Sequence, residues 1–526
     1  TLSGSYATGN VTGGDNYIGG LVGYQYVGTL SGSYATGSVS GAQAVGGLVG
    51  FNAAQGTISS SYASTSASVS GTNYIGGLVG YNLGTIDSSS YATRSVSGTN
   101  LIGGLAGFNS GTISSSYATG DISASGGMAG GLVGQNTFSI DANGNVTSIG
   151  AISRSYATGP VTGGFSVGGL VGYNEKASIS NTYATGTVTG SANDVGGLLG
   201  YNTNNGSVSS SYATGSVTAP AGVHVGGLLG QNISGTISSS YFDKGTTGQT
   251  AGLGKGTTTG ITGLSTSEMQ RSENFSGFNF TSTWFNYDGY TKPLLRSFLT
   301  PLSVTYTVSG SKTYDGTTAC GTITCTYTTG TLTSGKNLLG TSSLALSSKN
   351  AGTVSGTGLY SDQQGYLMTA SNSGTATIAK APLTITGNSA STTYTGLAQT
   401  VSGYTVSGLV GSDTTSSLSG VSASVTGTNA GSYTNAVTAS TQTNYTVSIA
   451  NGSLTIAKAP LTITGNSTST TYTGLAQTVS GYTVSGLVGS DTTSSLSGVS
   501  ASVSGTNAGS YTNAVTASAQ TNYTVS

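Results

Sequence analysis

Two stretches decide the fold: Gly-Gly-Leu-Val-Gly-Tyr-Asn at residues 76–82 and Gly-Thr-Ile-Ser-Ser-Ser-Tyr-Ala-Thr-Gly at residues 111–120. Variants of both recur through the first half of the chain, and the tyrosine returns after steps of 28, 28, 29, 26, 39, 27, 29 and 29 residues. Its copies are Tyr6, Tyr34, Tyr62, Tyr91, Tyr117, Tyr156, Tyr183, Tyr212 and Tyr241. Short apolar runs separated by Gly and Asn favour strands over helices. Because units this small bury a core only by stacking, we predict an all-β fold in which residues 1–241 form a β-solenoid of about nine coils of 27–30 residues.

A leucine recurs in register with the tyrosine. Its copies are Leu21, Leu48, Leu78, Leu105, Leu132, Leu170, Leu198 and Leu228. Like positions of stacked coils lie above one another, so we expect these side chains to share one continuous core. The single step of 39 residues contains an insertion at residues 138–149, which we expect to leave its coil as a loop.

An asparagine closes the first stretch in most copies, and Gln25 takes its place in the first. The copies are Asn52, Asn82, Asn109, Asn136, Asn174, Asn202 and Asn232. Stacked amides can hydrogen-bond from one coil to the next, as in cross-β ladders. The alternative is a ligand site repeated along the coils. We favour the structural ladder.

Residues 242–300 change character. The only tryptophan, Trp284, lies among five of the ten phenylalanines, and these are Phe275, Phe278, Phe280, Phe285 and Phe298. A solenoid needs its open end covered, so we expect an aromatic capping segment here; an aromatic ligand pocket is the alternative. Ser265 and Glu268 have capping-box spacing, which predicts one short helix.

A longer repeat occupies the rest of the chain. Residues 380–448 and 458–526 align at an offset of 78 with three differences, and a looser relative lies at about 302–378. Alternating short strands and turn signals favour small Ig-like sandwiches. We therefore predict Ig-type domains at 301–378, 379–457 and 458–526.

The last of these domains lacks a counterpart of residues 449–457, which read as a turn and a closing strand. We therefore expect this domain to be truncated before its last strand and the chain to be a fragment of a longer protein. A sandwich without that strand leaves unpaired N–H and C=O groups at its edge. We expect fewer backbone hydrogen bonds there than in the preceding domain.

Cys320 and Cys325 are the only cysteines. In one extended strand they would lie ~17 Å apart on opposite faces, too far for a bond. A disulfide between them requires a turn, and both an intradomain bond and free thiols remain open.

The composition excludes several classes of function. Charged residues make up 5% of the chain, with 13 Lys and Arg against 14 Asp and Glu, so no basic stripe exists for a nucleic-acid partner. No apolar stretch reaches the ~18 residues of a membrane span. The only histidine, His224, has no Cys or His partner for a metal, and no His-Glu-x-x-His motif or phosphate-binding loop occurs. We expect no cofactor, no metal site, no catalytic residue and no enzymatic activity.

The repeats resemble families of bacterial surface proteins. The Gly-Gly-Leu-Val-Gly-Tyr-Asn units resemble the GLUG motif, Lys312-Thr-Tyr-Asp-Gly316 looks like the YDG motif of large adhesins, and the 78-residue units are similar to MBG-type Ig-like domains. The combination resembles filamentous-haemagglutinin-like adhesins. This resemblance implies a protein secreted to the cell surface of a Gram-negative bacterium, with a role in adhesion, aggregation or biofilm formation.

Three functions compete. An adhesin would use the solenoid or its inserted loop to contact a host, neighbouring-cell or matrix surface, or a glycan. A structural matrix or spacer filament would self-associate into fibres and leave recognition to other parts. An ice-binding rod would need flat ladders of Thr and Ser; no strict Thr-x-Thr column recurs, so this alternative is the weakest.

Overall fold

The computed structural model of the chain describes residues 1–64, 67–220, 223–257 and 259–526. The chain divides into two compact units: residues 1–303, 329–341 and 359–369 form the first, and residues 304–328, 342–358 and 370–526 form the second. The predicted all-β fold is confirmed, since the described residues contain a single α-helix, α1 (Lys244–Thr247), beside many strands. Over the same ranges, no helix has the length and apolar character needed to cross a membrane.

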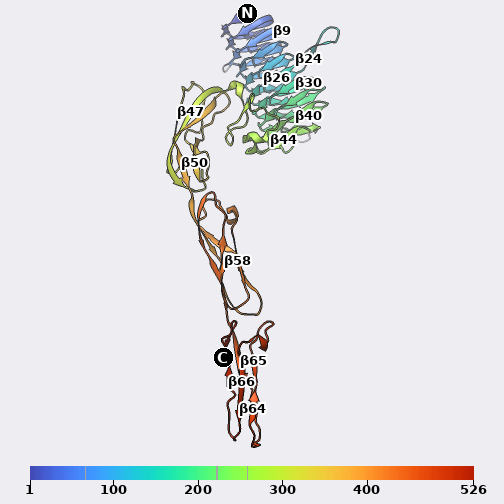
Figure 1. Cartoon of the computed structure of the whole chain (residues 1–526). Helices are drawn as coiled ribbons and strands as arrows, with labels where there is room; N and C mark the ends of the chain where they lie inside the picture. The colour runs from blue at the N-terminus through green and yellow to red at the C-terminus, as the bar shows by residue number, and fades with distance from the viewer. Residues whose placement is uncertain (65–66, 221–222, 258) are drawn as a thin grey trace. The chain divides into compact units, whose positions relative to one another are not determined.

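The first unit is a stack of parallel strands, in which each strand pairs with the same residues of the next repeat (Figure 1). Tyr62 lies opposite Tyr91, and Ala63 lies opposite Ala92. Successive residues of a strand point to opposite faces, so the alanines face the core and the tyrosines face outward. This tyrosine sheet consists of β2 (Tyr6–Ala7), β6 (Tyr34–Ala35), β10 (Tyr62–Ala63), β15 (Tyr91–Ala92), β20 (Tyr117–Ala118), β27 (Tyr156–Ala157), β32 (Tyr183–Ala184), β37 (Tyr212–Ala213), β42 (Ser240–Asp243) and β44 (Ile261–Leu264).

A second sheet carries the motif asparagines. Its strands are β1 (Leu2–Ser3), β5 (Val22–Ser31), β9 (Val49–Ser59), β13 (Val79–Asn82), β18 (Ala106–Asn109), β23 (Val133–Asn136), β30 (Val171–Glu175), β35 (Leu199–Thr203), β40 (Leu229–Ile233) and β43 (Leu253–Gly256). It continues through β14 (Thr85–Asp87), β19 (Thr112–Ser114), β26 (Ala151–Ser153), β31 (Ser178–Ser180), β36 (Ser207–Ser209) and β41 (Thr236–Ser238).

Two further parallel sheets complete the stack. One consists of β3 (Val11–Thr12), β7 (Val39–Ser40), β11 (Val69–Ser70), β16 (Val96–Gly98), β21 (Ile122–Ala124), β28 (Val161–Gly163), β33 (Val188–Gly190) and β38 (Val217–Thr218). The other consists of β4 (Asn16–Gly19), β8 (Gln43–Gly46), β12 (Asn73–Gly76), β17 (Asn100–Gly103), β22 (Ala129–Gly130), β29 (Val167–Gly168), β34 (Val195–Gly196) and β39 (Val225–Gly226). Stacked parallel sheets of this kind are consistent with the predicted solenoid.

The motif leucines form one continuous core, as predicted. All of them from Leu48 to Leu228 are fully buried in a single cluster, and Leu21 packs against it half-buried. The glycine before each leucine allows adjacent coils to approach closely. A Cβ on Gly77 would lie 2.1 Å from the carbonyl oxygen of Gly104 in the next coil, so no larger residue fits there.

The insertion at residues 138–149 is more regular than the predicted loop. It forms an antiparallel hairpin of β24 (Phe138–Ile140) and β25 (Val146–Ile149), which leaves the stack in Figure 1. The Asp141 carboxylate accepts the backbone N–H groups of Asn143 and Asn145, each at 2.9 Å. These bonds close the turn, and the apolar residues on either side pair as strands.

The strand stack continues past residue 241. Leu229 pairs with Leu253, and Tyr241 pairs with Thr262. The chain then forms η1 (Glu268–Gln270), η2 (Ser272–Asn274), β45 (Trp284–Phe285), β46 (Leu294–Leu295) and η3 (Arg296–Phe298). The predicted helix after Ser265 is thus two short 3-10 turns.

Residues 300–379 contain β47 (Thr300–Thr313), β48 (Thr324–Thr329), β49 (Ala345–Leu346), β50 (Gly352–Val354), β51 (Gly356–Thr357), β52 (Tyr366–Ser373) and β53 (Ala376–Ala379). The next domain contains β54 (Ala381–Gly387), β55 (Ala390–Thr393), β56 (Gln399–Ser402), β57 (Tyr404–Ser407), η4 (Thr415–Ser417), β58 (Ser422–Gly427), β59 (Gly431–Asn435), β60 (Val437–Thr438), β61 (Tyr445–Ala450) and β62 (Gly452–Ala457). The last contains β63 (Ala459–Gly465), β64 (Gln477–Ser480), β65 (Tyr482–Ser485), η5 (Thr493–Ser495), β66 (Ser500–Gly505), β67 (Val515–Thr516) and β68 (Tyr523–Val525).

The last two domains differ as the sequence predicts. Strand β62 pairs with β55 on one side and with β59 on the other. Residues 458–526, all of which are described, have no counterpart of these two ladders, and residues 468–471 and 509–513 lie outside any strand. The expectation of fewer backbone hydrogen bonds is confirmed.

Candidate functional site

The motif asparagines hydrogen-bond to one another through the core. The Nδ2 of Asn82 donates to the Oδ1 of Asn109 over 2.7 Å, and the Nδ2 of Asn109 donates to the Oδ1 of Asn136 over 2.7 Å. The same bond joins the other consecutive members of the series, from Asn52 to Asn232, at 2.7–2.9 Å. Because these side chains are buried, their amides are not available to a ligand at the surface.

The tyrosines form a column on the outside of the stack. From Tyr6 to Tyr212, neighbouring rings lie face to face, with centroids 4.9–5.3 Å apart and planes within 8°. This spacing is close to the distance of ~4.8 Å between paired strands. The rings cover one another's faces, so the column presents ring edges and hydroxyl groups to its surroundings.

The aromatic segment packs on this column. Phe298 lies edge-to-face against Tyr117 and Tyr156, with centroids 5.7 and 5.0 Å away, and Trp284 lies 5.8 Å from Tyr212. We expected the segment to cover the open end of the solenoid. Its contacts are instead with the side of the stack, because stacked tyrosine edges offer an extended apolar surface there.

Hydrogen bonds hold the aromatic segment against the tyrosine column. The Tyr212 hydroxyl donates to the carbonyl oxygen of Pro293 over 2.7 Å, and the Tyr241 hydroxyl donates to that of Ser276 over 2.9 Å. The indole N–H of Trp284 donates to the Oδ1 of Asn181 over 3.1 Å. A buried tyrosine or tryptophan usually needs a hydrogen-bond partner for its polar group. The contact between the aromatic segment and the column supplies one to Tyr212, Tyr241 and Trp284.

Burial under the cover changes the acidity of the column. It raises the pKa of Tyr117 to about 12 despite a hydrogen bond with Gln364. The pKa values of Tyr156, Tyr183 and Tyr212 also lie well above the ordinary value, and burial is the main cause for each. These phenols remain neutral throughout the ordinary pH range.

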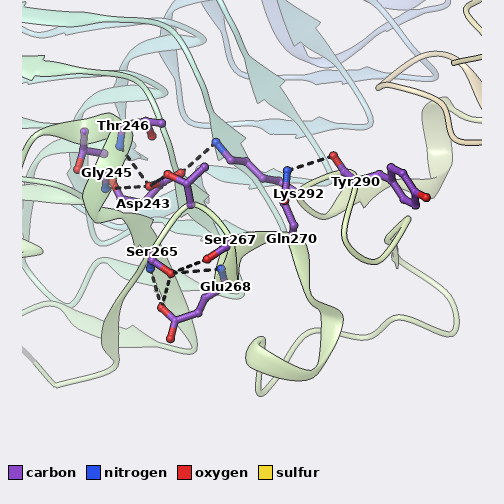
Figure 2. Close-up of polar contacts among 11 residues, drawn as sticks. Asp243, Gly245, Thr246, Ser265, Ser267, Glu268, Gln270, Tyr290 and Lys292 are labelled. Atoms are coloured by element: carbon purple, nitrogen blue, oxygen red, sulfur yellow. Dashed lines mark hydrogen bonds and ion pairs between the residues drawn. The ribbon is translucent and has the colours of Figure 1, made fainter. Parts of the chain in front are cut away.

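An ion pair links the later part of the aromatic segment to the end of β42 (Figure 2). The Nζ of Lys292 lies 3.1 Å from the Oδ2 of Asp243. The other carboxylate oxygen accepts the N–H groups of Gly245 and Thr246 at the start of α1 and the hydroxyl of Thr266. Burial opposes ionisation of Asp243, but the hydrogen bonds from Thr266 and Lys292 outweigh it and hold the pKa of this carboxyl below its ordinary value.

The segment's turn is closed by the predicted capping pair. The backbone N–H of Ser265 donates to the Oε2 of Glu268 over 2.7 Å, and the N–H of Glu268 donates to the Ser265 hydroxyl over 3.3 Å (Figure 2). The reciprocal bonds of a capping box are therefore present, although the turn that follows is 3-10.

A second aromatic column runs along the stack and is exposed to solvent at the coil of Tyr24. The rings of Tyr24, Phe51, Tyr81 and Phe108 stack in sequence with centroids 4.1–5.1 Å apart. Tyr17 and Tyr74 lie edge-on against it, and Tyr26 stacks on Tyr24. We call these seven residues the aromatic patch. Tyr17, Tyr24 and Tyr26 are 42%, 48% and 72% exposed.

The remaining residues singled out in the sequence are not part of the patch. Cys320 and Cys325 are joined by a disulfide, with a turn between them and a Cα–Cα distance of 6.2 Å. The Nδ1 of His224 lies 2.8 Å from the Oδ1 of Asp194 in the neighbouring coil.

Two family models match the chain. The model of the GLUG motif matches residues 14–40, 98–123, 163–189 and 191–218, and that of the MBG domain (YGX type) matches residues 383–455 and 461–526. The chain carries GLUG motifs and MBG domains. No curated protein and no solved structure matches it.

The two family models match different parts of the fold. The GLUG matches fall in the parallel stack, and the MBG matches cover the two near-identical domains. GLUG motifs and MBG domains occur in surface and adhesin-like proteins. The resemblance of residues 312–316 to the YDG motif remains a prediction.

Sequence reasoning missed the aromatic patch and Asp194. The signal for the patch was the residue before each motif asparagine, which is aromatic at Phe51, Tyr81 and Phe108. Asp194 lies 30 residues before His224, and only the stacking of the GLUG coils brings the two together.

Proposed function

We propose that the chain is a segment of an extracellular adhesin or surface fibre that mediates cell attachment, aggregation or biofilm formation. The observation that carries this proposal is the aromatic patch, in which stacking holds the rings rigidly and Tyr17, Tyr24 and Tyr26 are exposed. Rigid aromatic side chains give large contact areas at a low entropic cost, and exposed apolar patches mark interaction sites.

The chemistry of the surface favours glycans and matrix proteins as partners. With 5% charged residues, the chain has little to attract a polyion. Tyrosine rings and hydroxyl groups can pack on the apolar faces of sugars and on side chains of surface proteins. The proposal includes no catalytic step and places the protein on the surface of a Gram-negative bacterium.

A spacer filament is the second candidate, and the short connections before and after the first MBG domain favour it. Only Lys380 separates β53 from β54, and only Lys458 separates β62 from β63. The Nζ groups of these lysines donate to the carbonyl oxygens of Gln442 and Gln520 in the domains that follow. Junctions this short leave little freedom for a flexible linker. We further propose that these domains are Ig-like sandwiches and that the GLUG stack is a solenoid of about nine coils.

A binding screen distinguishes the two candidates. The whole chain, carrying a fluorescent label, is applied to arrays of glycans and of matrix proteins. An adhesin gives micromolar or tighter binding that is lost in the triple variant Tyr17→Ser, Tyr24→Ser and Tyr26→Ser. A matched control replaces two exposed apolar residues outside the parallel stack, Leu332 and Leu397, by Ser. If the unmodified chain bound to neither array, the adhesin would be rejected and the spacer filament would remain.

A further inference from the structure

The hairpin β24–β25 is a two-stranded sheet of its own. Its ladder matches Phe138 with Ile149 and Ile140 with Val146, and residues directly opposite on an antiparallel ladder point to the same face. The register shift in this ladder skips Thr147. Such a bulge lets Val146 and Ile149 share a face although they are three residues apart. Four apolar side chains therefore lie on one face of the hairpin.

The opposite face of the hairpin is polar, and this is the face that contacts the stack. The hydroxyls of Ser139 and Ser148 hydrogen-bond with that of Ser110 in the preceding coil, at 2.5 and 3.2 Å. On the apolar face, Ile140, Val146 and Ile149 are 58%, 41% and 50% exposed. A single hairpin is at best marginally stable in water until its apolar face is packed, and an exposed apolar patch marks an interaction site. The apolar face is therefore a contact surface that faces away from the chain's own core.

Charges of opposite sign lie at the two ends of this face. At the base of the hairpin, the Nζ of Lys176 lies 5.1 Å from the centroid of the Phe138 ring. At the tip, hydrogen bonds from Asn145 and Asn143 hold the pKa of Asp141 below its ordinary value, so its carboxylate is ionised at neutral pH. Neither charge belongs to an ion pair with another of the described residues.

A second copy of the same hairpin is complementary to both the apolar face and the charges. When two hairpins pack face to face about a two-fold axis, with their tips pointing in opposite directions, the tip of each lies over the base of the other. Ile140 of one copy then meets Phe138 of the other, and Asp141 of each copy approaches Lys176 of the other. The charges select this orientation, because the reverse one would bring like charges together at both ends.

We propose that the apolar face of the hairpin β24–β25 is a self-association surface, through which two copies of the chain join in an antiparallel dimer. The contact is small, and interfaces below about 1,200 Å² in total are weak. Copies displayed side by side on a cell surface offset this weakness, because each raises the effective concentration of the others. The surface shares no residue with the aromatic patch, so the proposal stands whether or not that patch binds a glycan.

Sedimentation equilibrium of the whole chain over a range of concentrations tests the proposal. We expect a monomer–dimer equilibrium, and a dissociation constant at least tenfold higher for the double variant Ile140→Ser and Ile149→Ser. The matched control, Leu332→Ser and Leu397→Ser, changes exposed apolar residues outside the hairpin and should associate like the unmodified chain. A chain that lacks residues 138–149 should remain monomeric, and circular dichroism checks that its stack is folded.

A charge reversal tests the orientation of the two copies. Lys176→Glu places a carboxylate beside Asp141 of the second copy, so it should weaken the dimer about fivefold or more at low salt. The difference should shrink as salt screens the repulsion. Lys349→Glu changes the net charge by the same amount at an exposed lysine outside the stack, and it should leave the dissociation constant unaltered.

Three results would overturn the proposal. These are a chain that stays monomeric at every concentration, a dimer that persists without residues 138–149, and an unchanged dissociation constant for Lys176→Glu. If the unmodified chain stayed monomeric but lost binding to matrix proteins in the double isoleucine variant, a different protein would be the occupant instead. Failure of the adhesin proposal is read from the arrays alone, so the two failures can be told apart.

Discussion

The Nδ2 of Asn82 donates to the Oδ1 of Asn109 over 2.7 Å within the core of the stack, where neither side chain is exposed. The Nδ2 of Asn109 in turn donates to Asn136 and to the carbonyl oxygen of Gly111. Each amide is thus both donor and acceptor, and a single substitution affects two neighbouring coils.

Replacing Asn109 by Ala should lower the free energy of unfolding of the stack by about 1–3 kcal/mol, because partners in both directions are left unsatisfied in the core. Urea denaturation followed by circular dichroism measures the change. Asn143→Ala, on the exposed hairpin turn, is the control and should change stability by less than about 0.5 kcal/mol. Equal effects would contradict a stabilising role of the ladder.

Replacing Leu105 by Asp should be much more damaging. Leu105 is fully buried in the leucine cluster, and an aspartate there would be an unpaired charge in an apolar core. We expect a loss of about 4 kcal/mol or more, which is the range of the most severe substitutions. Ile149→Asp on the exposed strand β25 is the control. An unchanged melting temperature for Leu105→Asp would mean that the strand register is wrong.

The Asp243–Lys292 pair makes stability depend on pH in the acidic range. The folded state holds the pKa of Asp243 below its ordinary value, so the carboxylate stabilises the fold fully above about pH 5 and loses this effect as pH falls through the unfolded and then the folded pKa. Asp243→Asn should lower stability by about 2 kcal/mol at pH 7. The gap between the melting temperatures of the two proteins should narrow as pH falls through the unfolded and then the folded pKa of Asp243; a constant gap would contradict this assignment.

The covered tyrosines should make the first unit sensitive to alkali. Burial raises the pKa of Tyr117 to about 12 and raises those of Tyr156 and Tyr212 further. The neutral phenol is therefore favoured in the folded state, and its contribution is complete below the unfolded pKa of about 10 and is lost as pH rises towards the folded pKa. Absorbance at 295 nm should reveal a group of phenols that ionise well above pH 10.

Removing Trp284 tests whether burial by the aromatic segment raises the pKa of the column tyrosines. Trp284→Ala should bring the ionisation of Tyr183 and Tyr212 closer to pH 10, because the indole packs on both rings. Tyr290→Ala, at a half-exposed ring outside the column, serves as the control. If Trp284→Ala left the absorbance titration unaltered, burial by the aromatic segment would not be the cause.

The stacked part of the fold could be predicted because the same residue types recur in the sequence at a nearly constant step. A leucine such as Leu105 and a glycine such as Gly77 recur at a nearly constant step, and only stacking buries them all. The place of the aromatic segment could not be predicted in this way. Its phenylalanines require an apolar partner, but nothing local specifies whether that partner is the end of the stack or the tyrosine column.

Single departures from the repeat were also beyond reach. Arg94 stands where other copies have glycine, as at Gly120. It is fully buried, and its guanidinium donates to the carbonyl oxygens of Ala35 and Gly37. Burial lowers its pKa to about 10, and no periodic pattern records such an exchange.

The hairpin β24–β25 shows where the stack tolerates an insertion. It enters after Asn136 and leaves before Ile152, yet Asn136 still bonds to Asn174, and Ile152 still pairs with Ile113. The inserted residues therefore leave the asparagine hydrogen bonds and the strand pairing of the stack intact. A foreign peptide inserted at this turn should therefore be displayed outside the stack, while the coils beneath keep their pairing.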